Sequence, residues 1–292
     1  MRPLVESGWV AARLHDPRVA LVDCRFALDD PDAGRRAYVG GHLPGAAFCD
    51  LETDLSGRHG PGRHPLPDAD AFARSARRAG IRADGITIAS DDGTHAGAAR
   101  LWWLLRHMGH PRAAVLRGGL AAWQGPLRAG YEAIRPGDLR PRPAAGDVVT
   151  RADVLAGLGQ PGRVLIDARA PERYRGEHEP IDPVAGHIPG AVNVPFTAVL
   201  GPPAGGASDA ARRLAELARA DAELVAYCGS GVTACVVLLA LAAAGREDAR
   251  LYPGSWSDWC AQGLPVATGP GRTLRPTVSD AGGGSPPAGG AS

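Results

Sequence analysis

An internal repeat constrains the fold of this chain more than any other feature of its sequence. The first half contains, in order, VALVDCRF, GGHLPGAAFCDL, ITIASDD and VLRGGLAAW. The second half contains their counterparts in the same order, VLIDARA, AGHIPGAVNVPF, LVAYCGSG and LYPGSWSDW. Self-similarity over a long period marks a repeated structural unit, so the sequence predicts two copies of one domain. The length of 292 residues agrees with two domains of ordinary size.

Short apolar and β-branched runs predict the strands of each copy, and helical periodicity predicts the helices that follow them. The predicted strands are 19–23, 86–90, 163–167 and 223–227, and the clearest predicted helices are 208–220 and 233–245. Strands that alternate with helices form parallel sheets. The fold class is therefore predicted as α/β, with two tandem domains that are each a parallel sheet flanked by helices.

Composition marks the domain boundaries. Residues 133–147 are rich in Pro, Gly and Arg and have no apolar period, which is typical of a linker. We expect an N-terminal domain over 1–132 and a C-terminal domain over 148–269. The tail, 270–292, is rich in Gly, Pro and Ser and is expected to be disordered.

Charge and cysteine usage exclude several classes of function. A net charge of +1 gives no case for a nucleic acid or membrane partner. All 32 basic residues are arginine, which excludes Schiff-base chemistry on lysine. The five cysteines are irregularly spaced and predict neither a disulfide framework nor a metal site, and no cofactor is expected. With no secretory signal and no apolar run long enough to cross a bilayer, the protein is expected to be cytoplasmic.

Cys228 is the strongest candidate for a reactive group. It follows the predicted strand 223–227, and ligands gather at the carboxyl ends of parallel strands. Gly229, Ser230 and Gly231 lead from it into a helix, so two glycines and a helix N-terminus would direct N–H groups toward the sulfur and stabilise an anion there. The alternative is a small buried hydrophobe, but a packing residue does not need a glycine-rich loop.

The chain resembles the tandem-domain rhodaneses, and most closely the 3-mercaptopyruvate sulfurtransferases, in CGSGVTA, the paired GHLPGA and GHIPGA turns, DAR and GSWSDW. The resemblance covers nearly the whole chain apart from the tail. It implies that the C-terminal copy carries a persulfide on Cys228 and that the N-terminal copy is inert. Asp91 or Asp92 stands where the second copy has Cys228, and a carboxylate cannot take up sulfane sulfur. The first domain is therefore expected to form one wall of the active site.

The same resemblance implies a proton relay of Ser230, His64 and Glu52. His64 could instead be an exposed histidine in a proline-rich loop, and Ser230 could also bond its own turn. The remaining substrate-binding candidates are the carboxylate-binding Arg173 and the loop residues Gly229, Gly231, Val232 and Thr233.

Position 181 departs from the family pattern. A second family arginine is expected just after Glu179-Pro180, where this chain has Ile181. Arg173 could alternatively form a surface ion pair with Glu177.

Other notable residues are expected to be structural. These are Asp167, Arg169, the turn histidines His42 and His187, and Cys24, Cys49 and Cys260. Cys235 is expected to pack in the core, with a redox role as the alternative.

The expected function is transfer of sulfane sulfur from 3-mercaptopyruvate or thiosulfate, through Cys228, to a thiol, cyanide or a thioredoxin-like protein. 3-Mercaptopyruvate is expected to be the better donor, because the loop contains no cation and backbone N–H groups alone would hold the charge. A cysteine phosphatase needs an arginine six positions after its cysteine, where this chain has Ala234. A binding module or a persulfide carrier that does not turn over remains an alternative.

Overall fold

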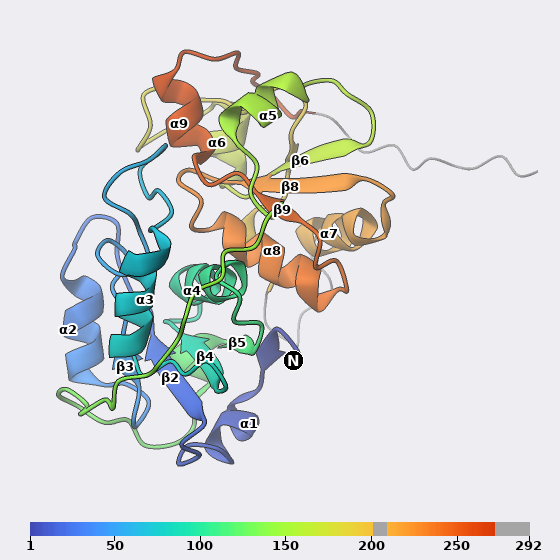
Figure 1. Cartoon of the computed structure of the whole chain (residues 1–292). Helices are drawn as coiled ribbons and strands as arrows, with labels where there is room; N and C mark the ends of the chain where they lie inside the picture. Colours follow the sequence, from blue (N-terminus) through green and yellow to red (C-terminus); the bar gives the residue numbers. More distant parts are fainter. Residues whose placement is uncertain (201–208, 272–292) are drawn as a thin grey trace, which may run out of the picture.

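The computed structural model describes residues 1–200 and 209–271, which form two α/β units (Figure 1). The first unit contains β1 (Leu4–Val5), α1 (Ser7–Ala11), β2 (Val19–Asp23), α2 (Ala33–Gly40), β3 (Ala47–Phe48), α3 (Ala69–Arg78), β4 (Ile86–Ser90), α4 (Ala96–His107), β5 (Ala113–Leu116) and η1 (Gly119–Ala122). The second contains α5 (Arg151–Ala156), β6 (Arg163–Asp167), α6 (Pro171–Arg175), β7 (Val192–Asn193), η2 (Phe196–Ala198), α7 (Asp209–Arg219), β8 (Glu223–Tyr227), α8 (Ala234–Ala243), β9 (Arg250–Leu251) and α9 (Ser255–Ala261). The predicted tail lies outside the described residues from residue 272 onward.

Each unit is built on one parallel sheet, which confirms the predicted fold class. The strand order is β1-β5-β4-β2-β3 in the first sheet and β7-β6-β8-β9 in the second. The central pairs have the same register, with Asp23 opposite Ser90 in one and Asp167 opposite Tyr227 in the other. The next residue along the chain is Asp91 in the first copy and Cys228 in the second. Asp91 is therefore the structural counterpart of Cys228.

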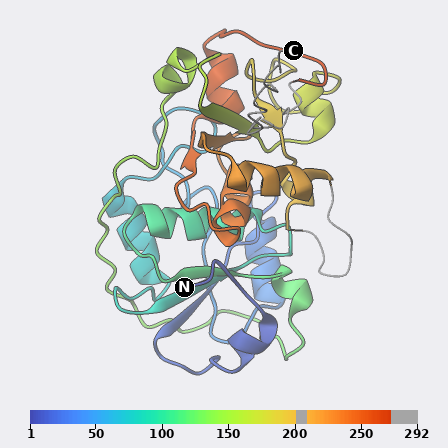
Figure 2. The same ribbon diagram turned by 90° about the vertical axis from the view of Figure 1, so that its right-hand side faces the viewer.

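One apolar core extends through both domains because two helices meet at their boundary. α4 of the first domain packs against α8 of the second (Figures 1 and 2). Nearly every residue of α8 is buried, since its sequence ACVVLLALAA is apolar on all sides. α4 follows the loop of Asp91, and α8 follows the loop of Cys228. The contact between the two helices therefore brings the first domain close to the cysteine loop.

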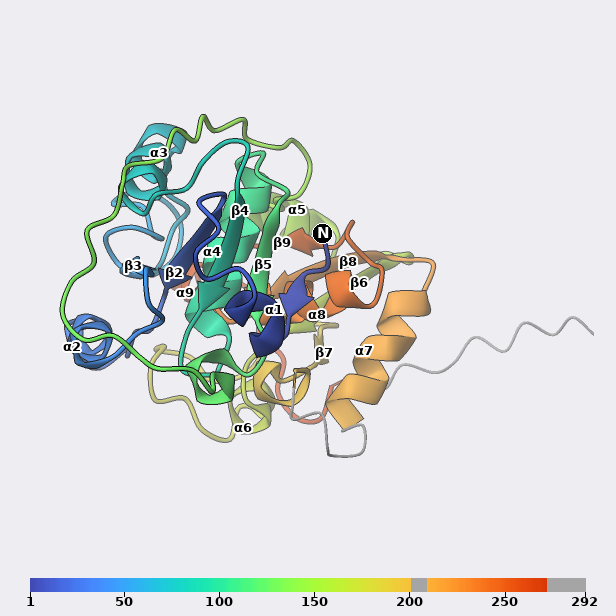
Figure 3. The ribbon, with the colours of Figure 1, turned by 90° about the horizontal axis from the view of Figure 1, so that it is seen from below.

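The segment 133–147 contains no helix or strand and follows the first domain before it enters the second (Figure 3). The N–H of Arg142 donates to the carbonyl of Met108, and Val148 then pairs with Leu251 beside the second sheet. The exact domain boundaries stay a prediction. Among residues 1–200 and 209–271, no helix is long and apolar enough to span a bilayer.

Candidate active site

The loop after β8 wraps around the sulfur of Cys228. Cys228 is 1% exposed, and the N–H of Gly231 donates to its Sγ at 3.1 Å. Gly231 has a φ of +78°, and a Cβ on it would lie 2.6 Å from the carbonyl oxygen of Pro253, so only glycine fits here. The N–H of Cys228 donates to Oγ of Ser255 at 3.1 Å. Thr233 occupies the N-cap position of α8, which begins one residue later.

His64 joins the first domain to this loop. Its Nδ1 lies 2.7 Å from Oγ of Ser230, and its Nε2 lies 2.8 Å from Oε1 of Glu52. The side chain of His64 is 2% exposed, so the interpretation as an exposed loop histidine is wrong. Burial lowers the pKa of His64, although the Glu52 carboxylate opposes the effect. A neutral imidazole therefore donates from Nε2 to Glu52 and accepts at Nδ1 from the hydroxyl of Ser230.

Arg100, which the sequence analysis did not select, holds these segments together. It lies on α4 and is fully buried, and its guanidinium donates to the carbonyl oxygens of Leu55, His64, Pro65 and Gly231 at 3.2, 3.0, 3.3 and 3.1 Å. No carboxylate within the described ranges pairs with it, and burial lowers its pKa. A charged residue in the apolar run AGAARLWWLL is the one sequence signal that could have drawn attention to it.

Arg173 lies beside the cysteine loop but is held by acids other than the one considered from sequence. Its Nη2 lies 2.6 Å from Oε1 of Glu179 and 3.1 Å from Oδ2 of Asp182. Glu177 pairs with Arg175 instead, at 2.6 Å. Arg173 is therefore fixed in one position by two buried carboxylates.

Arg63 is a second guanidinium at the same place, and sequence reasoning missed it. Its Nη1 donates to Oδ1 of Asp182 at 2.8 Å. A Cβ placed on Gly229 would lie 3.1 Å from Nη2 of Arg63 and 3.7 Å from Nη2 of Arg173. The sequence predicts that backbone N–H groups alone hold negative charge at this loop. That prediction is wrong, because two arginines from outside the loop flank it.

The residues expected to be structural are buried among structural partners. Arg169 pairs with Asp167 at 2.6 Å, both almost fully buried. The ring Nδ1 of His42 lies 2.7 Å from the carbonyl of Tyr38, and that of His187 lies 2.8 Å from the carbonyl of Tyr174. Each histidine also stacks on that tyrosine. The arrangement occurs in both copies, which favours a role in the fold.

The other cysteines lie in the interior. Cys24, Cys49, Cys235 and Cys260 are all buried and without disulfides. The Sγ of Cys235 lies 3.3 Å from the carbonyl oxygen of Gly231, so this thiol contacts the loop of Cys228. Burial raises the pKa of Cys235 to about 12, which keeps it a protonated thiol and fits a packing role.

In the first domain a carboxylate occupies the position that the sulfur of Cys228 has in the second. The oxygens of Asp91 accept backbone N–H groups from Gly93, His95 and Ala98 at 2.9, 3.1 and 3.2 Å. Burial raises the pKa of Asp91 to about 6. The first copy thus keeps the anion-binding loop, but its own side chain fills it.

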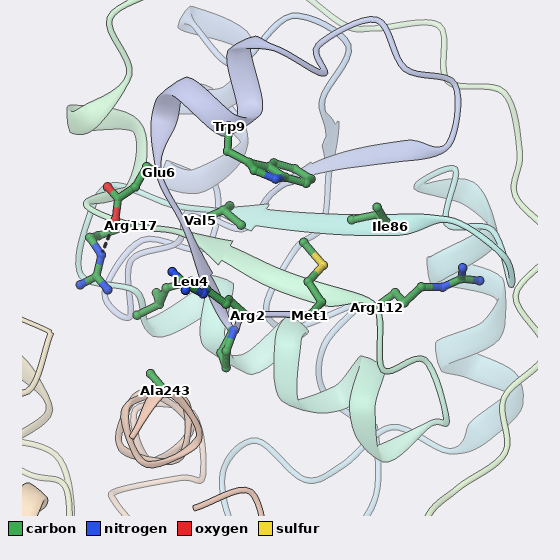
Figure 4. Close-up of a pocket in the computed structure, with 11 residues that line it drawn as sticks. Met1, Arg2, Leu4, Val5, Glu6, Trp9, Ile86, Arg112, Arg117 and Ala243 are labelled. Atoms are coloured by element: carbon green, nitrogen blue, oxygen red, sulfur yellow. Dashed lines mark hydrogen bonds and ion pairs between the residues drawn. The ribbon is translucent and has the colours of Figure 1, made fainter. Parts of the chain in front are cut away.

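A separate cavity of about 820 Å³ lies at the N-terminal edge of the first sheet (Figure 4). Its lining includes Trp9, Ile86 and Arg112, and an Arg117–Glu6 ion pair lies at its side. None of the sequence-predicted site residues lines it. In the part of the chain that the structure describes, no cluster of His, Cys, Asp and Glu could hold a metal ion.

Comparison with known proteins gives the family. The model of the rhodanese-like domain matches residues 6–126 and again 150–262. A Pseudomonas aeruginosa protein named as a probable 3-mercaptopyruvate sulfurtransferase is 49% identical, over 91% of this chain and 98% of its own. A Mycobacterium tuberculosis protein named as a candidate thiosulfate sulfurtransferase is 43% identical, over 87% of this chain and 92% of its own.

A solved structure agrees. The crystal structure of the Escherichia coli 3-mercaptopyruvate sulfurtransferase aligns with a TM-score of 0.77 and 34% identity, and the alignment covers 88% of this chain and 100% of that one. Both copies of the repeat and the loop that carries Cys228 lie within the matched regions. The chain therefore belongs to the rhodanese family and is a sulfurtransferase with two rhodanese-like domains in tandem.

Proposed function

We propose that this enzyme takes sulfur from 3-mercaptopyruvate as a persulfide on Cys228 and passes it to a thiol, cyanide or a thioredoxin-like protein. The observation that carries the proposal is the hydrogen-bonded chain from Ser230 through His64 to Glu52, beside the loop of Cys228. The names of the similar proteins support a sulfurtransferase but divide between two donors. The proton relay at the site favours 3-mercaptopyruvate over thiosulfate.

In the first half-reaction, Cys228, Ser230 and His64 account for every proton and electron pair that moves. Ser230 and His64 take the thiol proton of Cys228, and the thiolate attacks the sulfur of the donor. The S–S bond forms as the C–S bond of the donor breaks, and the electron pair of that bond becomes the enolate of pyruvate. Ser230 returns the proton to the enolate carbon, so persulfide and pyruvate form without gain or loss of a proton. Glu52 stabilises the protonated imidazole between the two transfers.

The second half-reaction needs only an entering nucleophile. A thiolate or cyanide attacks the outer sulfur, the S–S bond breaks, and Cys228 leaves as a thiolate. The N–H of Gly231, which lies 3.1 Å from Sγ, stabilises that thiolate.

A proton relay favours 3-mercaptopyruvate over thiosulfate. Pyruvate enolate must gain a proton on carbon, whereas sulfite leaves thiosulfate as a stable anion and needs none. Arg173 would bind the donor carboxylate, and Gly229, Val232 and Thr233 would line the donor-binding loop with Gly231. Thiosulfate as the main donor is the second candidate, because two guanidiniums flank the loop.

Two measurements test the proposal. The ratio of kcat/KM for 3-mercaptopyruvate and thiosulfate, with one common acceptor, should favour 3-mercaptopyruvate, and equal or higher efficiency with thiosulfate would overturn the donor assignment. Intact-protein mass should rise by about 32 Da with 3-mercaptopyruvate and return to its starting value when a thiol is added. A carrier would show one stoichiometric transfer instead of repeated turnover.

A further inference from the structure

We infer that Arg63, from the catalytically inert domain, supplies the second guanidinium of the donor-carboxylate site, in place of the arginine that this chain lacks at position 181. The inference rests on the proposed function. Ile181 is 44% exposed and offers no charge, so a donor that depended on position 181 would lose one of its two cationic contacts. Arg63 brings a cation to the same loop from the other domain.

The backbone of Arg63 is fastened to the catalytic domain. Its N–H donates to Oγ of Ser257 in α9 at 3.0 Å. The preceding Gly62 lies so close to Gly254 that a Cβ would be 2.5 Å from the carbonyl oxygen of Gly254. Arg63 is therefore attached to the catalytic domain at two points, through its backbone to α9 and through its side chain to Asp182.

Asp182 sets the two arginines side by side. Its carboxylate is 2% exposed and accepts from Arg63 at 2.8 Å and from Arg173 at 3.1 Å. With Glu179 also bonded to Arg173, two carboxylates balance the two guanidiniums, and the group carries no net charge. Recognition of an anion here would depend on directed N–H groups rather than on a long-range field.

Both arginines direct an unpaired edge toward the cysteine loop. Over residues 1–200 and 209–271, neither Nη2 of Arg63 nor Nη1 of Arg173 has a hydrogen-bond partner. A Cβ on Gly229 would lie 3.1 Å from the first and 3.8 Å from the second. Two donor edges thus face the residue next to Cys228, from opposite domains, and a carboxylate above Gly229 would accept from both. Donor binding would then require the two domains to stay together.

The test is steady-state kinetics of Arg63→Ala with 3-mercaptopyruvate, with the exposed and distant Arg112→Ala as the matched control. Loss of one charged hydrogen bond is expected to raise KM about 10- to 100-fold, with kcat changed by less than about threefold. Arg63→Lys keeps the charge but not the planar fork and should fall between Arg63→Ala and wild type. Arg112→Ala should behave as wild type.

Restoring the missing arginine is the decisive arm. Adding Ile181→Arg to the Arg63→Ala variant should return KM to within about fivefold of the wild-type value. An unchanged KM in Arg63→Ala, or a lower kcat with unchanged KM in both the Ala and Lys variants, would overturn the inference, because the second pattern indicates only support of the neighbouring His64. Arg63→Gln serves if Arg63→Ala does not fold.

The failure of this inference is distinguishable from that of the proposed function. If wild type gains no sulfur from 3-mercaptopyruvate by intact mass, the proposed function fails. If wild type gains sulfur and Arg63→Ala shows wild-type KM, only the assignment of Arg63 fails.

Discussion

His64 of the first domain and Ser230 of the second lie 2.7 Å apart, Nδ1 to Oγ, and this hydrogen bond joins the two halves of the site. The first domain therefore brings His64, its carboxylate partner Glu52 and the buried Arg100 to the loop of Cys228. In the proposed mechanism the site is divided between two copies of one fold, and the first copy takes part although Asp91 occupies the position of the cysteine.

Cys228→Ser should lose turnover by at least about 1000-fold while keeping its fold, since a hydroxyl is almost isosteric but cannot form the persulfide. Cys235→Ala is the matched control, because Cys235 is also buried and lies below the same loop. It should change kcat/KM by less than about fivefold. Circular dichroism and steady-state kinetics check both variants. Equal loss in both would contradict a mechanism with one reactive cysteine.

His64→Gln should lower kcat with 3-mercaptopyruvate by about 100- to 10,000-fold, the usual contribution of a positioned acid and base. The loss with thiosulfate should be smaller, because that reaction still needs the Cys228 thiolate but sulfite needs no proton on carbon. Parallel kinetics with both donors check this. A similar loss with both would mean that His64 acts in a step common to both donors, such as deprotonation of Cys228, and would contradict its role in protonating the enolate.

The pH profile follows from the direction of the His64 pKa. Because burial lowers it from 6.5, the neutral imidazole persists below that pH, and the acid limb of kcat/KM should lie below pH 6.5. Glu52 raises the pKa of His64, so Glu52→Gln should move the acid limb to still lower pH. Measurement of kcat/KM against pH for both proteins checks the direction, and a shift to higher pH would contradict it.

Arg100→Met should destabilise the protein by about 1–3 kcal/mol, because four buried carbonyl oxygens lose their donor. Removal of a buried charge offsets part of this cost. It should also lower kcat, since the carbonyls of His64 and Gly231 lose their common partner. Urea unfolding and kinetics check the two effects. Wild-type values in both would show that helix packing alone aligns the domains.

Stability should fall as pH decreases through 6.5. Burial lowers the pKa of His64, His95, His110 and His187, so the unfolded chain takes up protons first. Each such histidine can cost up to about 1.4 kcal/mol per pH unit below its unfolded value. Asp91 acts in the opposite direction, because its pKa is raised to about 6 and its protonated form is favoured in the fold. Four histidines outweigh one aspartate, so the net loss should grow as pH falls below 6.5.

Urea unfolding at about pH 7.5 and about pH 5.5 checks the sign. His110→Gln keeps a polar group beside Thr87, which lies 3.2 Å from the ring Nε2 of His110. This variant should lose less stability than wild type over the interval. An identical loss would show that His110 does not contribute to the pH dependence.

The sequence by itself determined the fold and pointed to the candidate reactive residue, because both follow from local patterns. The strands 19–23, 86–90, 163–167 and 223–227 were predicted to the residue, since short apolar runs specify buried parallel strands. Cys228 was identified from its place at a strand end and from the glycine loop after it. His64 and Glu52 were selected only through family resemblance.

Tertiary structure alone decided how charge is arranged around the sulfur. Arg63 carries no local signal of function, and the only signal for Arg100 is a charge within an apolar run. Each acts through residues far away in the chain, Asp182 and Gly231 respectively. Arg173 was identified, but its partners Glu179 and Asp182 were not. Local patterns specify helices and strands within a few residues, whereas the field at an interdomain site depends on how two separately encoded domains pack. That packing follows from the burial of α4 against α8, which no short segment of sequence describes.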